Sequence, residues 1–269
     1  SLEKPYLMNT NGNSEADLLH IARASHLYYP GVIKTGTTKK NNPEFKLTSI
    51  SKANNIKHEF KHSAESDTLA TMLTARLIKQ KAPALWQSSF LTTSKNDVLS
   101  ILKKELMCIS TENYGGGPKG HLVTYISQHP VYGYPLAIDL RHDVDTFLDI
   151  NTDQLRDLLK SKPKPIRTIK HSAHPIIMNP SFIKNIEPYN AIGMEKLIER
   201  AKKIKENKNL AERLSIIKKE EVEEKNQSNQ LDKYVEETIY KGGFPNAKDN
   251  LNIQKFNQAN NWSDKLKLK

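Results

Sequence analysis

The stretch His62-Ser63-Ala64-Glu65-Ser66-Asp67 opens a helix and places an imidazole and a carboxylate about one turn apart. Ser63 is a favourable N-cap, and an apolar pattern of helical period predicts a helix that runs to Lys81 and ends before Pro83. His62 precedes the positive helix end, which favours a neutral ring that can accept a proton. Asp67 offers the hard oxygen ligand that Mg²⁺ or Mn²⁺ prefers. Such a pair is more often a cap or surface feature, so the rest of the chain must support a catalytic role.

Composition limits the classes of partner and setting. The chain has 269 residues, 37% of them hydrophobic, which suffices for one large or two to three small domains. A net charge of +11 and a pI near 9.4 favour polyanions as partners, with nucleic acid first and acidic peptide tails or membrane surfaces second. The single Cys108 excludes a disulfide framework or zinc knuckle built from this chain alone and favours a reducing, cytoplasmic setting. No membrane-length apolar run or signal-peptide pattern occurs, so a soluble protein is expected.

The first part of the chain is expected to be helical. A helix over residues 14–29 with a capping box of Ser14 and Asp17, a loop over 34–43 and a short helix over 45–54 precede the helix of Asp67. No central strand accompanies these helices. Because they cannot close a core by themselves, a missing sheet is expected upstream of this sequence.

After Pro83 the sequence pattern becomes typical of β-strands. Strands are predicted over 106–110, 121–127, 135–140 and 166–170, with glycine- and proline-rich turns over 115–120 and 130–133. A short helix over 153–159, capped by Thr152, separates the last two strands. A long amphipathic helix over about 195–225 follows. After it come a polar linker over 226–232, the start of another helix over 234–240 and a polar tail. The 115–119 turn has glycines and a lysine but lacks the order of a P-loop, so a hairpin loop is favoured.

Several segments together resemble the bacterial exodeoxyribonuclease I family, 3′→5′ single-strand exonucleases of the DEDDh superfamily. They are 17–19 with Arg23, 45–56, 62–67, 69–71, 129–130, 138–140, 167–170, 174–177 and 238–244. The resemblance implies an α+β fold in three parts. Residues 1–82 would be the helical C-terminal part of a ribonuclease-H-like exonuclease domain, 83–225 a small β-rich SH3-like domain with its long helix, and 226–269 the start of a helical domain. The chain would then be a fragment truncated at both ends.

The resemblance also implies roles for individual residues. His62 would be the general base, and Asp67 the last of four acidic ligands that bind two Mg²⁺ or Mn²⁺ ions, in an enzyme of DNA repair and recombination. The other acids would lie upstream, so the isolated chain is expected to be inactive. The residues that match DNA-contacting positions are Arg23, Lys46, Lys95, Arg167 and Ser172. Lys46 replaces an arginine of the family and loses its bidentate fork.

A partner site follows from the same resemblance. Family members bind the acidic, Phe-ending tail of single-stranded-DNA-binding protein, and Lys184 and Asn179 match positions of that pocket, while Tyr29 and Ser88 depart from it. A monomer is expected. Two alternatives stay open: a DEDDh enzyme that acts on RNA ends, and a non-catalytic module that binds single-stranded nucleic acid or a partner. A zinc site is disfavoured, because no Cys partner or helical His pair supports it. The histidines considered for it are His121, His129, His171 and His174.

Overall fold

The computed structural model of the chain describes residues 13–58, 63–114, 116–228, 246–259 and 261–266. Its contacts divide the chain into two units, residues 1–221 and 222–269. In the second unit, α11 (Ala247–Gln258) and α12 (Trp262–Leu266) are helical where a polar tail was expected. Asn246 and Asp249 form a capping box that starts α11. The predicted helix over 234–240 lies outside the described residues.

Helices dominate the chain up to residue 90, whereas helices were predicted only up to Pro83, with strands after it. They are α1 (Leu18–Tyr28), α2 (Leu47–Ala53), α3 (Ala64–Lys81) and α4 (Pro83–Phe90). The capping-box prediction is wrong, because α1 begins after Asp17, whose carboxylate accepts a hydrogen bond from Leu19 N–H at 2.8 Å. The segment expected as a loop contains a short hairpin of β1 (Gly36–Thr37) and β2 (Pro43–Glu44). Pro83 follows the end of α3 and occupies the first position of α4, where a missing N–H is tolerated.

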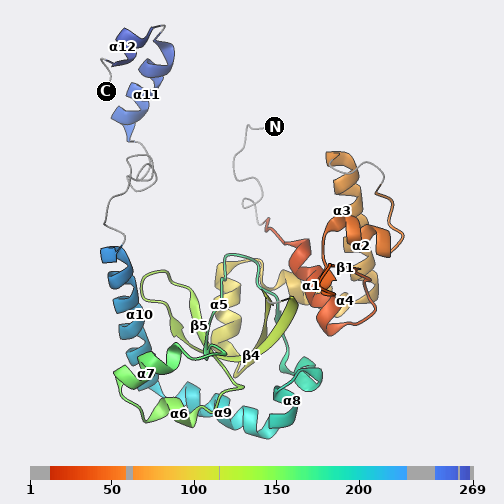
Figure 1. Ribbon diagram of the computed structural model, residues 1–269, viewed down its shortest axis with the longest axis vertical. Coiled ribbons are helices and arrows are strands. Elements are labelled where there is room, and N and C mark those ends of the chain that lie inside the picture. The colour runs from red at the N-terminus through yellow and green to blue at the C-terminus, as the bar shows by residue number, and fades with distance from the viewer. Residues whose placement is uncertain (1–12, 59–62, 115, 229–245, 260, 267–269) are drawn as a thin grey trace. The chain divides into compact units, whose positions relative to one another are not determined.

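An antiparallel sheet forms the centre of the first unit (Figure 1). Its strand order is β6-β5-β4-β3-β7, and the strands are β3 (Cys108–Tyr114), β4 (Gly117–Gln128), β5 (Pro135–Asp139), β6 (Ile166–Thr168) and β7 (Ile177–Met178). The four predicted strands are confirmed, as is the α+β class. Elements that were not predicted include β7 and the helices α4 and α5 (Lys95–Lys104). A two-residue strand gives no readable alternation, which explains why β7 escaped the sequence analysis.

Successive side chains of the strands point to opposite faces of the sheet, so the strands contribute to two separate hydrophobic clusters. One face of the sheet carries Ile109, Leu122 and Ile138, whose cluster continues into α1 through buried residues such as Ile21. The other face carries a second cluster, in which Val98 and Leu102 of α5 pack against residues such as Cys108, Val123 and Ala137. Because the first cluster contains residues from both sides of position 82, packing shows no break there. The predicted division at 82 therefore stays a prediction.

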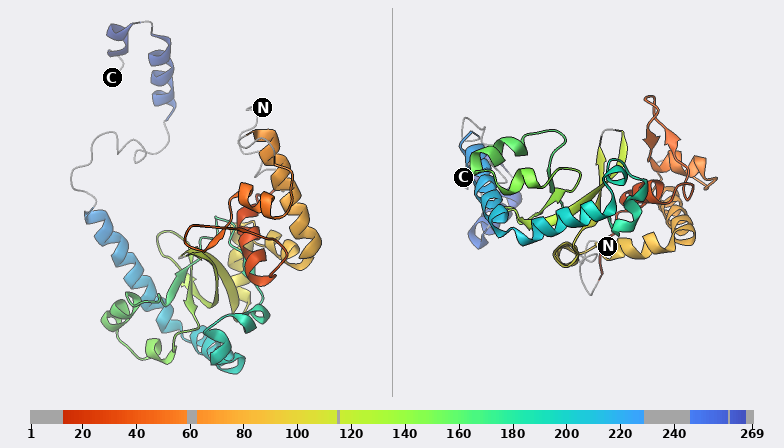
Figure 2. Two further views of the ribbon diagram at one scale, coloured as in Figure 1. Left: turned by 45° about the vertical axis from the view of Figure 1, so that its right-hand side comes forward. Right: turned by 90° about the horizontal axis from the view of Figure 1, so that it is seen from below.

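Six further elements lie between residues 145 and 228, and the last of them runs past residue 221, where the first unit ends. They are α6 (Asp145–Leu148), α7 (Thr152–Leu159), the 3₁₀ helix η2 (Pro180–Asn185), α8 (Tyr189–Ile192), α9 (Met194–Glu206) and α10 (Lys208–Ser228). The predicted long helix is thus two helices, because Asn207 breaks it and accepts a hydrogen bond from Leu210 N–H. Asn151, not Thr152, caps α7. Figure 2 shows α1 to α4 gathered on one side of the sheet. Within the described ranges, no helix is both long and apolar enough to cross a bilayer.

Candidate nucleic-acid interface

Asp67 lies in the first turn of α3, as predicted, and among the described residues the imidazole that contacts it is that of His58. The distance from His58 Nε2 to Asp67 Oδ1 is 2.6 Å, and the His58 side chain is almost fully buried. Its other ring nitrogen, Nδ1, is buried and has no hydrogen-bond partner in the described part of the chain. His62 lies outside the described residues, so its convergence with Asp67 stays a prediction. Sequence analysis missed His58, because its only signal is a histidine in the loop before the helix.

The metal-ligand inventory around Asp67 is incomplete in the part of the chain that the structure describes. No group of three or more His, Cys, Asp or Glu side chains there could hold a metal ion. Asp67 provides one hard oxygen ligand, whereas a two-ion site needs several carboxylates. The described residues therefore do not form a two-metal site by themselves. The histidines of the strands and turns that were considered for zinc belong to no such ligand group among the described residues.

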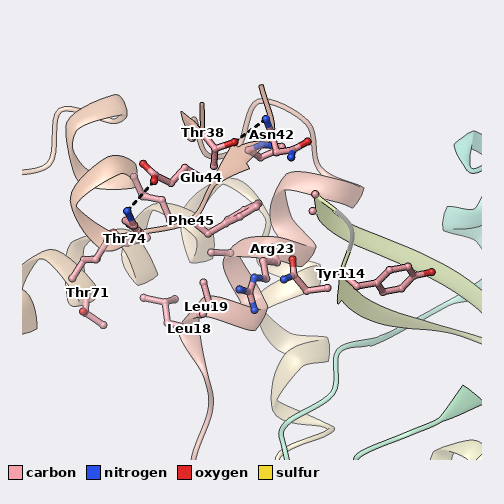
Figure 3. A pocket seen from close by; sticks show the side chains of 18 residues that line it. Leu18, Leu19, Arg23, Thr38, Asn42, Glu44, Phe45, Thr71, Thr74 and Tyr114 are labelled. Carbon is pink, nitrogen blue, oxygen red and sulfur yellow. Dashed lines mark hydrogen bonds and ion pairs between the residues drawn. The ribbon is translucent and has the colours of Figure 1, made fainter. Parts of the chain in front are cut away.

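A hollow of about 720 Å³ lies beside α1 (Figure 3). Its wall is built by four segments of the first unit: the start of α1, the β1–β2 hairpin with the start of α2, the middle of α3, and the β3–β4 turn. Figure 3 shows Arg23 projecting from α1 into the hollow beneath Phe45. Leu18, Leu19 and Thr71 line its floor. Lys46, which also lines it, lies 3.2 Å from the Glu44 carboxylate.

Arg23 is the cation best placed to hold an anion in this hollow. Its guanidinium carbon lies 6.0 Å from the centre of the Phe45 ring. Its Nε is buried and finds no acceptor among the residues that the structure describes. Burial lowers the pKa of Arg23, and the charge of Asp17 opposes that shift, but an arginine stays protonated at neutral pH. The charged guanidinium of Arg23 lines the hollow and can bind an anionic ligand such as a phosphate there.

Two further hollows continue from this one along α1. The first, of about 540 Å³, shares Arg23 and Tyr114 with it and adds His20 and Lys170. The second, of about 930 Å³, shares His20 and contains Lys95 and Ser172. We call the three together the α1 trough. It brings together four of the five predicted DNA-contacting residues, which come from α1, the N-cap of α2, α5 and the loop after β6. They are Arg23, Lys46, Lys95 and Ser172.

His174 fixes the start of α1 at the edge of the trough. Its Nδ1 accepts a hydrogen bond from Asp17 N–H at 2.9 Å, and its Nε2 lies 2.7 Å from the Ser89 carbonyl oxygen of α4. Since a carbonyl can only accept, Nε2 must carry the proton and the ring is neutral. The backbone of His174 adopts a left-handed conformation with φ of 44°. A neutral histidine thus joins the loop after β6 to two helices.

Arg167, the fifth predicted DNA-contacting residue, lies in a different environment. It does not line the three hollows of the α1 trough, and only 9% of its side chain is exposed. Its NH2 group lies 3.2 Å from Asp139 and its NH1 group 3.1 Å from Glu112. These contacts join β6 to β5 and β3. The geometry favours a structural role, and a direct DNA contact by Arg167 stays an untested prediction.

Asp139, the partner of Arg167, is the centre of a buried polar cluster. Its carboxylate, at 0% exposure, lies 3.0 Å from His121 Nδ1, accepts a hydrogen bond from the Tyr189 hydroxyl at 2.5 Å, and lies 2.9 Å from Arg141 Nε. Burial alone would raise the pKa of Asp139. The hydrogen bonds from His121 and Tyr189 and the charge of Arg141 outweigh burial and hold that pKa below its usual range. Asp139 therefore stays ionised in the core.

The cluster reaches the trough through Tyr114. The Tyr114 hydroxyl lies 3.0 Å from His121 Nε2, and the Tyr114 ring lines two of the three hollows. The Tyr114 ring also contacts a cation, because the ammonium of Lys119 (Nζ) lies 4.9 Å from the centre of the ring. The chain Asp139–His121–Tyr114 was not predicted. Its members are separated in sequence, and no spacing rule links them.

The two predicted tail-binding residues lie at opposite ends of η2, Asn179 as its N-cap and Lys184 in its last turn. The Asn179 side chain accepts a hydrogen bond from Ser181 N–H at 2.9 Å and so caps this helix. Lys184 is exposed in its last turn. Phe182 of η2 lies 5.5 Å from the ring of Tyr29 on the α1 side. Whether this surface binds an acidic peptide is a prediction that the fold leaves untested.

Comparisons with known proteins agree on one group. No protein-family model matches the chain. It is 29% identical over 260 residues to exodeoxyribonuclease I of Haemophilus influenzae. The matched region covers 90% of this chain and 54% of that protein. It is 35% identical over 144 residues to exodeoxyribonuclease I of Buchnera aphidicola subsp. Baizongia pistaciae, which covers 52% of this chain and 30% of that protein. The chain thus spans about half the length of the Haemophilus influenzae relative.

Solved structures support the same fold. The chain superposes on Escherichia coli exonuclease I in complex with a dT13 oligonucleotide with a TM-score of 0.65 and 22% identity, which covers 92% of this chain and 54% of that one. An exonuclease I from Methylocaldum szegediense gives a TM-score of 0.67 at 19% identity, with 93% and 54% covered. A complex of exonuclease I with SSB-Ct gives a TM-score of 0.64 at 22% identity, with 89% and 52% covered.

Proposed function

We propose that this chain, a relative of bacterial exodeoxyribonuclease I, forms the part of a 3′→5′ exodeoxyribonuclease that holds single-stranded DNA and supplies the general base. The observation that carries the proposal is the position of Arg23, which lines two hollows of the α1 trough beside the Phe45 ring and whose Nε has no acceptor among the described residues. Cations and an aromatic ring beside it suit a single strand, which is held by charge and by stacking. A cytoplasmic setting, a monomer and a role in DNA repair are part of the proposal.

The proposed chemistry assigns one step to His62. An unprotonated imidazole would accept a proton from the water that attacks the terminal phosphodiester. Asp67 would be one of the acidic ligands of two Mg²⁺ or Mn²⁺ ions, which, when bound, would lower the pKa of the attacking water and stabilise the charge of the transition state. His58, bonded to Asp67 at 2.6 Å, would orient that carboxylate. Further carboxylates are required beyond those that the structure describes.

A non-catalytic binding module is the second candidate, because the described residues hold no metal-ligand cluster. Both candidates need the α1 trough, so DNA binding does not separate them. The complete reading frame does. A strand with an Asp-x-Glu pair upstream of residue 1 supports the nuclease, whereas a frame that starts at this sequence supports the module.

Replacement of Arg23 by alanine tests the trough. We expect the Kd for a fluorescein-labelled oligo-dT, measured by fluorescence anisotropy, to rise about 10-fold, because charge-assisted hydrogen bonds to a phosphate contribute about 1.5–3 kcal/mol. The salt dependence of log Kd should also fall by about one. Arg23→Lys should recover only part of the affinity, since it keeps the charge but not the fork.

The matched control for Arg23 is Arg156→Ala. Arg156 is a partly exposed arginine of α7 that pairs with Asp153 and Glu220 and does not line the trough hollows. Its loss should change the Kd less than about twofold, because only net charge is altered. Equal losses in the two variants would mean that charge alone, and not the trough, holds the DNA.

Lys184 tests the proposed partner surface. A labelled acidic peptide that ends in Phe, titrated at low salt, should bind about 3- to 10-fold more weakly to Lys184→Ala, because an ammonium that faces a terminal carboxylate is lost. Lys219→Ala, an exposed lysine of α10, is the control. Binding that is indifferent to Lys184→Ala would remove Lys184 from the site.

A further inference from the structure

The β4–β5 turn carries an exposed aromatic side chain, Tyr132, that the proposed trough does not use. Tyr132 is 51% exposed and Val131 is 53% exposed, although both are apolar or aromatic residues at the tip of a hairpin. The ring of Tyr132 lies 6.4 Å from that of Tyr134, and the ring of Tyr134 lies 5.6 Å from that of His171 in an edge-on contact. Three rings therefore follow one another from the tip of the turn to the loop after β6.

The turn holds these rings in place by its backbone. His129 Nδ1 accepts hydrogen bonds from the N–H groups of Val131 and Tyr132, each at 3.3 Å, and the His129 ring lies 4.7 Å from that of Tyr132. Gly133 supplies a φ of 69°, which other residues rarely adopt. His129 N–H donates to the Tyr134 carbonyl at 2.7 Å and closes the hairpin. The turn needs His129 and Gly133, but nothing in its backbone requires an aromatic ring at Tyr132.

The row of rings starts where the α1 trough ends. His171 is followed directly by Ser172, which lines the last hollow of the trough together with Lys95. The charge of Lys95 reaches His171, since after burial it is the next cause that lowers the pKa of that ring. Lys170, on the other side of His171, lines the middle hollow. Cations thus lie beside the inner end of the row, and the exposed ring of Tyr132 lies at its outer end.

We propose that Tyr132, Tyr134 and His171 form an aromatic platform on which bases of a single strand stack after the strand leaves the α1 trough at Lys95 and Ser172. The proposal rests on the proposed function and extends it to a second binding site. Stacking on an aromatic ring tolerates any base, because every base has a π-face, so the platform would add affinity without sequence preference. The cations beside it would hold the phosphates between the stacked bases.

Oligonucleotide length separates the platform from the trough. We expect the unmodified chain to bind oligo-dT more tightly as its length grows from about 4 to about 16 nucleotides, the range of known single-strand sites. Tyr132→Ala should leave the Kd of the shortest oligonucleotides within about twofold and raise that of the longest about 10-fold, in line with about 1–3 kcal/mol per stacked base. Tyr132→Phe, which keeps the ring, should bind like the unmodified chain.

Several outcomes overturn the platform. A Tyr132→Ala defect that is equal at every length, or no defect at any length in a chain that binds normally, excludes a second site while leaving the trough intact. Loss of acidic-peptide binding in place of long-oligonucleotide binding would assign the rings to a protein partner. No binding of any oligonucleotide by the unmodified chain overturns the proposed function and the platform with it. Circular dichroism checks that Tyr132→Ala keeps its fold.

Discussion

Asp139→Ala should lower the free energy of unfolding by about 3–5 kcal/mol, the usual cost of removing one partner from a buried ion pair. The reason is the set of groups that would lose their acceptor. Arg167, Arg141 and His121 converge on this carboxylate from β6, the end of β5 and β4, and it has no exposure. Without Asp139, buried cations remain with poor compensation. Urea unfolding followed by circular dichroism measures the loss.

Two comparisons show whether buried charge is the cause. Asp153→Ala removes another aspartate with an arginine partner, Arg156, but Asp153 is 87% exposed and should cost less than about 1 kcal/mol. Asp139→Asn keeps the size of the side chain and removes its charge, so it should still lose several times more than Asp153→Ala. An Asp139→Asn protein as stable as the unmodified one would refute the role of the charge.

The stability that Asp139 contributes should depend on pH. The folded-state pKa of Asp139 is lowered from an ordinary value near 3.9, so its ionisation stabilises the fold fully above about pH 4. As the pH falls below that value, the unfolded chain binds the proton more readily than the folded one, and the stabilisation is lost. The difference in stability between the unmodified protein and Asp139→Asn should therefore shrink below about pH 4.

A polypeptide of the printed sequence should release no mononucleotides above background from the 3′ ends of single-stranded DNA when Mg²⁺ or Mn²⁺ is added. Two-ion hydrolysis needs several carboxylates around the attacked phosphate. In the proposed assignment Asp67 is the only metal ligand that this sequence supplies, and the described residues contain no ligand cluster around it or elsewhere. Denaturing gel electrophoresis of end-labelled oligo-dT measures the release.

Binding and a matched variant make this result interpretable. The same preparation should still bind oligo-dT through the α1 trough, which shows that it is folded. Release at catalytic protein concentrations would contradict the prediction only if His62→Ala abolished it, because a contaminating nuclease would be indifferent to that change. Release that depends on His62 would show that the printed sequence contains a sufficient set of ligands.

The elements that sequence analysis predicted well are those that local patterns determine. The helix from Ala64 to Lys81 follows from a cap, a 3.6-residue period and a proline, all within 20 residues of one another. β3, β4 and β5 follow from β-branched runs between glycine-rich turns. The errors also have local causes. Asn207 ends a helix although the apolar stripe continues past it. The short helix α5 was missed because it directly precedes the predicted strand that became β3.

In the candidate site, too, the features that depend on local sequence were predicted, whereas those that depend on distant residues were not. By itself, the sequence determined the helix that carries Asp67, the basic character of the chain and the resemblance to exodeoxyribonuclease I, because these depend on residue type and on order along the chain. Only the tertiary structure decided that Arg23, Lys46, Lys95 and Ser172 share a trough while Arg167 is buried against Asp139. Exposure and hydrogen-bond partners depend on residues far away in sequence, such as the 157 positions between Asp17 and His174, and no local pattern contains that information.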